Sequence, residues 1–126
     1  MPGLLSFKRG QAAELLVAAA ALSRGGRVVF NYDPYDTWDL QIDDIRYQVK
    51  LSYKRSDRSG GSTYVDIIRT SRWDYYEPDA ADALAVVEFN AGSPLIHVFE
   101  WDKVYELGRI SLPTLLKVKH DTWTIQ

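Results

Sequence analysis

Two segments in which polar and apolar residues alternate flank the dipeptide Asp43-Asp44, and this pattern constrains the fold more than any other. The segment WDLQID (residues 38–43) leads into the dipeptide, and RYQVKLSYK (residues 46–54) follows it. Alternation with a period of two is typical of a β-strand whose two faces have different environments. Aspartate is common in tight turns, so we expect an antiparallel hairpin with Asp43-Asp44 at its two central positions.

The register of this hairpin determines which side chains share a face. Directly opposed residues point to the same face, and diagonal neighbours remain within reach of each other. The expected pairs are Ile42 with Ile45, Gln41 with Arg46, and Asp39 with Gln48, with Lys50 as the diagonal neighbour of Asp39. Asp39, Gln48 and Lys50 would therefore converge, while Leu40, Val49 and Leu51 point to the opposite side. A slip of one residue would separate the three polar groups.

An Ala- and Leu-rich segment precedes the hairpin and predicts a single long helix. Ser6 is a candidate N-cap, the segment FKRGQAAELLVAAAALSR (residues 7–24) follows, and Gly25-Gly26 is expected to end the helix. Apolar residues recur at helical spacing, so we expect one stripe of the helix to face a core. The members of that stripe are Ala12, Leu15, Leu16, Ala19 and Leu22.

Further strands are expected along the rest of the chain. RVVFNY (residues 27–32) is typical of a buried strand, and STYVDIIRT (residues 62–70) is another candidate. ALAVVEFN and PLIHVFEW predict a second hairpin around Ala91-Gly92-Ser93, and the tail is expected to contain a short helix or turn. A helix followed by mainly antiparallel strands indicates a mixed α+β (α/β) fold, most simply one sheet with the N-terminal helix packed on it. At 126 residues, the chain is expected to form a single domain over residues 1–126.

Composition excludes several classes of protein. With no cysteine, the chain has no disulfide framework and no Cys-ligated zinc site. The longest apolar run, AELLVAAAAL (residues 13–22), is too short to span a membrane and no signal peptide is recognisable, so we expect no membrane association and a cytoplasmic location. His97 and His120 are expected in structural or surface roles rather than as metal ligands.

The formal net charge is −2, but the basic residues gather in the middle of the chain. Such segregation can place a positive face on an acidic protein, although a solvated surface without a partner is the more common meaning of a charge run. The residues expected to bind DNA are Arg46, Lys54, Arg55, Arg58, Arg69 and Arg72.

The converging polar residues have the chemistry that phosphodiester hydrolysis requires. A carboxylate and an amide carbonyl oxygen are hard ligands suited to Mg²⁺, which lowers the pKa of a bound water and neutralises phosphate charge. A lysine beside them can stabilise developing charge or orient the attacking water. A polar strand face in water is the alternative interpretation, and Asp33 and Asp36 are rival ligands if the register differs.

The order of these residues resembles the PD-(D/E)XK nuclease superfamily, which has a restriction-endonuclease-like fold. Glu14 matches the glutamate of the first helix, Asp39 matches the aspartate, and Gln48-Val49-Lys50 matches the (E/Q)-x-K element. With KRGQAAELLVAAAALSRGGRVVF ahead of QVK, and DAADALAVVEF and PLIHVFEW after it, the chain looks closest to the branch of group I intron homing endonucleases. Trp38 stands where proline often precedes the aspartate, and Gln48 replaces the commoner glutamate, which should weaken Mg²⁺ binding unless Glu14 contributes.

This resemblance implies a Mg²⁺-dependent DNA endonuclease, with Mn²⁺ as a substitute. Glu14, Asp39 and Gln48 would hold the metal, and Lys50 would act at the attacking water. The substrate would be double-stranded or branched DNA, the chain would form a homodimer or a higher homo-oligomer, and its origin would be prokaryotic or phage. A Holliday-junction resolvase and a catalytically silent nuclease-fold module that binds DNA or a protein are the alternatives.

Overall fold

The protein combines one long helix with two β-sheets, and its computed structural model describes residues 2–33, 36–54, 62–69, 74–90 and 92–125. The elements in chain order are α1 (Pro2–Ser23), β1 (Val28–Phe30), β2 (Leu40–Ile42), β3 (Ile45–Leu51), β4 (Tyr53–Lys54), β5 (Thr63–Ile67), β6 (Ala83–Asn90), β7 (Ser93–Glu100), the 3-10 helix η1 (Trp101–Lys103), β8 (Gly108–Ser111), α2 (Leu112–Leu115) and β9 (Asp121–Thr124). The expected mixed α+β class is confirmed. No helix in these ranges is both long enough and apolar enough to cross a membrane.

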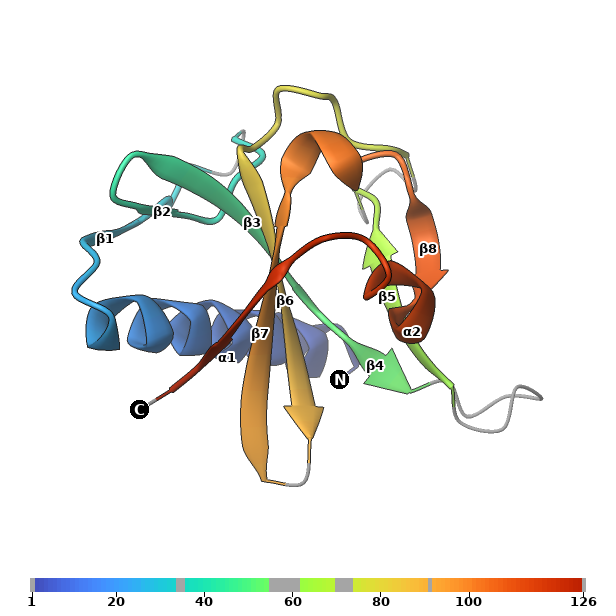
Figure 1. Cartoon of the computed structure of the whole chain (residues 1–126), viewed down its shortest axis with the longest axis horizontal. Coiled ribbons are helices and arrows are strands. Elements are labelled where there is room, and N and C mark those ends of the chain that lie inside the picture. The colour runs from blue at the N-terminus through green and yellow to red at the C-terminus, as the bar shows by residue number, and fades with distance from the viewer. Residues whose placement is uncertain (1, 34–35, 55–61, 70–73, 91, 126) are drawn as a thin grey trace.

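Six strands form the main sheet, in the order β1-β2-β3-β6-β7-β9. All neighbouring strands in it are antiparallel except β3 and β6, which run parallel. The main sheet is therefore mixed, and α1 packs on it as expected (Figure 1). Because a parallel pair needs a crossover, the chain must leave this sheet after β3 and return at β6.

The sequence pattern did not predict a second sheet of three strands, in the order β4-β5-β8. The crossover contributes β4 and β5 to this sheet, and β8 joins it later in the chain, after η1. The continuous alternation of residues 46–54 suggested one strand, but the chain is interrupted at Ser52. The backbone N–H and the side-chain hydroxyl of Ser52 both donate hydrogen bonds to the carbonyl of Val87, at 3.0 and 3.2 Å respectively. The chain then continues as β4 in the other sheet.

Two apolar clusters hold the layers together, one on each face of the main sheet. The first lies between α1 and the sheet and includes Val17, Leu40, Tyr47 and Val49. The second lies between the opposite face and the elements β5, η1 and α2, and is built around Trp101. Alternate residues of the central strands point to the two faces of the main sheet. In β3, Tyr47, Val49 and Leu51 point toward α1 and the first cluster, whereas Gln48 and Lys50 point to the opposite face.

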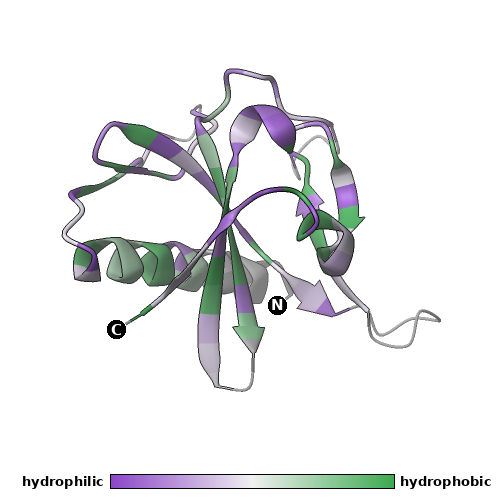
Figure 2. Ribbon diagram, viewed as in Figure 1, coloured by the Kyte–Doolittle hydropathy of each residue, from purple (hydrophilic) through white to green (hydrophobic). Residues whose placement is uncertain are grey.

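Helix α1 differs from the expectation in its start and in its buried face. It begins at Pro2, ahead of Ser6. Leu15 and Leu22 of the expected stripe are each 61% exposed, and the buried residues are instead Ala13, Val17, Ala18, Ala20 and Ala21. The error arises because apolar residues surround the C-terminal half of the helix, as Figure 2 shows, and the small alanines are the ones that let the helix approach the sheet closely.

The end of α1 is as expected. Gly25 has a φ of +83°, a conformation that favours glycine. The Gly26 N–H donates to the carbonyl of Ala21 at 2.9 Å and the Gly25 N–H to that of Leu22 at 3.0 Å. These two bonds are the Schellman pattern that satisfies the last carbonyls of a helix.

The hairpin of β2 and β3 has the register expected from the sequence, with Leu40 paired to Tyr47, Gln41 to Arg46 and Ile42 to Ile45. Asp43 adopts a positive φ of 55° at the turn, which aspartate tolerates better than most residues. The second hairpin, β6 with β7, is also confirmed, and it turns at Gly92. Strand β1 is not buried as expected, because it lies at the edge of the main sheet and Val29 is 58% exposed.

Candidate active site

Asp39 lies immediately before β2, at the point where β2 and β3 separate. Its backbone N–H donates to the carbonyl of Tyr47, and its side-chain Oδ2 accepts a hydrogen bond from the backbone N–H of Val49, each at 2.8 Å. The backbone N–H of Val49 therefore donates to the side-chain carboxylate of Asp39, and not to a backbone carbonyl of the neighbouring strand. This bond fixes the Asp39 carboxylate at the edge of β3.

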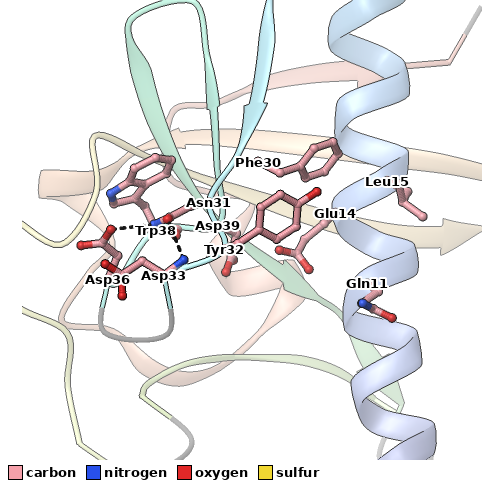
Figure 3. Close-up of a pocket in the computed structure, with 10 residues that line it drawn as sticks. All are labelled: Gln11, Glu14, Leu15, Phe30, Asn31, Tyr32, Asp33, Asp36, Trp38 and Asp39. Carbon is pink, nitrogen blue, oxygen red and sulfur yellow. Dashed lines mark hydrogen bonds between the residues drawn. The ribbon is translucent and has the colours of Figure 1, made fainter.

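Glu14 approaches Asp39 from helix α1, across an open cleft of about 530 Å³. In Figure 3 the two carboxylates lie on facing sides of this cleft, one from the helix and the other from the end of the loop before β2. Burial, and to a smaller extent the negative charge of Asp39, raises the pKa of Glu14 to about 7. A carboxylate pair with this property is only partly ionised at neutral pH and would be stabilised by a cation.

Gln48 and Lys50 lie on the face of the main sheet opposite α1. In the parallel ladder they pair with Leu84 and Val86, which belong to the second apolar cluster. Gln48 is only 7% exposed, and its Nε2 donates to the carbonyl of Thr37 at 2.7 Å. Neither Gln48 nor Lys50 lines the cleft that contains Glu14.

Lys50 is held from the side of the second sheet. Its Nζ donates to the carbonyl of Ile68 at 3.1 Å and lies 5.2 Å from the centre of the Tyr76 ring. Burial lowers the pKa of Lys50, and the negative charges of Asp39 and Asp66 oppose this effect. The ammonium group is therefore close enough to Asp39 for their charges to interact through the protein.

Asp39 is the residue that links the two sides of the site. Burial raises its pKa, while the hydrogen bond from Val49 and the charge of Lys50 act in the opposite direction. Its charge acts on Glu14 on the helix side and on Lys50 on the other side. Asp39 thus interacts by charge with both Glu14 and Lys50, which lie on opposite sides of it.

The available donors suit a hard divalent cation. Glu14 and Asp39 offer carboxylate oxygens to the cleft, whereas the amide of Gln48 is buried on the other face of the main sheet. The described part of the chain contains no group of three or more His, Cys, Asp or Glu side chains that could hold a metal. Two carboxylates on facing sides of the cleft, completed by water, are a donor set of the kind that Mg²⁺ accepts.

The rival ligands named from the sequence also line the cleft. Asp36 accepts a hydrogen bond from Nδ2 of Asn31 at 3.1 Å, and the backbone N–H of Asp33 donates to Oδ1 of Asn31 at 3.1 Å. The side chain of Asn31 thus hydrogen-bonds to both Asp33 and Asp36 on this side of the cleft. The carboxylate of Asp39 is instead held by the backbone N–H of Val49 in β3.

The basic residues expected to bind DNA do not form one cluster in the described ranges. Arg46 lies near the start of β3 and forms an ion pair with Asp82 at 3.2 Å, whereas exposed Lys54 lies at the far end of the same segment, in β4. Arg69 joins Asp74 through a backbone bridge. The other three basic candidates, Arg55, Arg58 and Arg72, lie outside the described residues.

Two aromatic residues near the site carried no clear signal in the sequence. Tyr32 is 87% exposed, stacks on Phe30 with ring centres 6.3 Å apart, and lines the cleft beside Glu14. Tyr76 contacts Lys50 from a distant part of the chain, which no local pattern could have indicated. His97 is only 5% exposed, with Nε2 2.9 Å from Oε1 of Glu88, in keeping with the structural role expected for it.

Comparison with known proteins identifies the fold but not the family. No protein-family model matches this chain, and no curated protein matches it. Among solved structures it is similar to the bacterial homing endonuclease I-Ssp6803I, with a TM-score of 0.66 and 24% sequence identity. The match covers 82% of this chain and 74% of that one. The chain therefore has a fold similar to that of a homing endonuclease.

Proposed function

We propose that this protein is a metal-dependent DNA endonuclease of the homing-endonuclease type. The observation that carries the proposal is that Glu14 and Asp39 line one cleft, and that the N–H of Val49, the residue before Lys50, holds the Asp39 carboxylate where β2 and β3 separate. The fold similarity supports it, because a solved structure with this fold is described as a homing endonuclease.

Each residue has a role that its surroundings support. Asp39, fixed by the Val49 N–H, and Glu14 would hold Mg²⁺, with Mn²⁺ as a substitute. Gln48 would contribute its amide oxygen only by turning from Thr37 toward Asp39. The metal would lower the pKa of a bound water and offset the charge of the scissile phosphate. Lys50 would orient the attacking water or stabilise negative charge that develops on the phosphate.

The open cleft leaves room for a phosphodiester backbone, and the exposed ring of Tyr32 at its wall is available to a substrate. Cutting both strands of a duplex requires two active sites, so a homodimer or larger homo-oligomer is part of the proposal. Exposed apolar side chains outside the cleft, including Leu22 and Val29, offer surface for such contacts.

The test is cleavage of supercoiled plasmid and of a four-way junction by the purified chain, with Mg²⁺ and with EDTA. We expect Mg²⁺-dependent nicking or linearisation of the plasmid, and loss of cutting in Asp39→Asn and Lys50→Ala by about 10²-fold or more. Preference for the junction would instead identify a resolvase.

Matched controls separate a catalytic effect from a general effect of charge. Asp44→Asn removes the same charge from the exposed turn of the same hairpin, and Lys117→Ala truncates an exposed lysine after α2. Both variants should cut like the wild type. Full Mg²⁺-dependent cleavage by Lys50→Ala would show that the proposed mechanism is wrong, and binding of DNA without any cleavage would indicate a silent module.

A further inference from the structure

The ammonium group of Lys50 has two partners outside the main sheet. Nζ donates to the carbonyl of Ile68, which directly follows β5, and lies over the ring of Tyr76 at 5.2 Å from its centre. A lysine side chain has four rotatable bonds, so without partners its charged end would sample many positions. Within a nuclease site, such freedom would place the ammonium group correctly only part of the time.

Both partners are themselves rigidly held. Tyr76 is 8% exposed and packs edge-on against Trp101, with ring centres 5.3 Å apart and planes at 68°. The indole Nε1 of Trp101 donates to the carbonyl of Glu77, next to Tyr76, at 3.1 Å. Ile68 is also 8% exposed. Tyr76 therefore belongs to the second apolar cluster, and Ile68 is buried without being part of it.

We propose that Tyr76 is a positioning residue for Lys50, and that its ring and the carbonyl of Ile68 together hold the ammonium group on the side of Asp39. A cation over the face of an aromatic ring is attracted by the electrons of the ring, and the attraction is stronger when water is excluded. The ring, rather than the hydroxyl, is the active part. The contact of Lys50 is with the ring of Tyr76, so Tyr76→Phe leaves that contact intact.

The catalytic consequence of this inference rests on the proposed nuclease function. With plasmid as substrate, Tyr76→Phe should cut at the wild-type rate. Tyr76→Leu, which lacks a ring, should lower kcat by about 10-fold or more and leave KM within about 2-fold, because small misplacements of a reacting group are costly to rate. Tyr76→Met, unbranched and also without a ring, replaces the leucine variant if that variant does not fold.

A double-mutant cycle separates positioning from packing. In a Lys50→Ala background, Tyr76→Leu should cause no further loss of kcat, because the residue through which it acts is gone. An equal loss in both backgrounds, or equal rates for Tyr76→Phe and Tyr76→Leu, would overturn the proposal.

A measurement without DNA keeps this outcome separate from the fate of the nuclease function. The Cε protons of Lys50 should be shifted upfield in NMR spectra by the ring current of Tyr76, relative to those of exposed Lys54. The shift should persist in Tyr76→Phe and disappear in Tyr76→Leu. A wild-type Lys50 signal like that of Lys54 would overturn the positioning role, whereas absence of cleavage with the shift present would overturn only the nuclease function.

Discussion

Replacing Glu14 with glutamine should stabilise the metal-free protein at alkaline pH and have no effect at acidic pH. Burial and the neighbouring Asp39 raise the pKa of Glu14 from 4.5 to about 7. Below about pH 4.5 the carboxyl is protonated in both the folded and the unfolded chain, so it contributes no difference. As the pH rises from 4.5 to 7, only the unfolded chain releases the proton, and the folded state loses stability until the pH passes the folded pKa.

The magnitude follows from the difference between these two pKa values, 7 − 4.5 = 2.5. At 1.36 kcal/mol for each pH unit, that difference corresponds to at most about 3.4 kcal/mol. Glu14 is only half buried, and solvent screens its charge, so we expect Glu14→Gln to gain about 1–2 kcal/mol at pH 8.

Urea unfolding in EDTA at about pH 4 and about pH 8 measures this gain directly. Glu77→Gln is the matched control, because Glu77 is exposed and should change stability by less than about 0.5 kcal/mol at either pH. The reasoning is refuted if Glu14→Gln is no more stable than the wild type at pH 8. It is also refuted if the gain is the same at both pH values, since the gain would then come from packing or helix propensity.

Three further perturbations test other parts of the molecule. Gln48→Glu adds a charged ligand, so calorimetry should show tighter Mg²⁺ binding; unchanged affinity would exclude Gln48 from the metal site. Lys54→Glu should weaken DNA binding and reduce the slope of log K against log salt by about 0.9, and an unchanged slope would place the DNA elsewhere. Gly25→Ala places a side chain in the left-handed region (φ +83°), so the free energy of unfolding measured with denaturant should fall by about 1 kcal/mol. An unchanged free energy of unfolding would contradict the C-terminal cap assigned to α1.

The parts of the fold that depend on neighbouring residues could be predicted from the sequence. Alternation on both sides of Asp43-Asp44 determined the register of β2 and β3, because a slip of one residue would have buried the wrong face. Gly92, with a φ of +90°, marked the turn between β6 and β7 in the same way. The proximity of Asp39 to Lys50 follows from the first of these hairpins.

The parts that depend on distant residues could not be predicted. The parallel pairing of β3 with β6 brings together segments that share no local signal, and it determines that Gln48 and Lys50 face the second cluster. The buried face of α1 was also beyond reach, because alanines and leucines surround the helix and only packing against the sheet selects Ala13 and Val17. The contact of Tyr76 with Lys50 is a third case.

The crossover between β3 and β6 also has a consequence for synthesis of the chain on the ribosome. All four candidate catalytic residues, Glu14, Asp39, Gln48 and Lys50, emerge well before the parallel partner of β3, which spans Ala83–Asn90. Since translation proceeds from the N-terminus, the nascent chain carries all of these candidate residues before it can arrange them. Until β6 emerges, β3 has an unpaired edge that is open to pairing with other chains. A truncated product that ends before Ala83 should therefore be inactive and prone to aggregate.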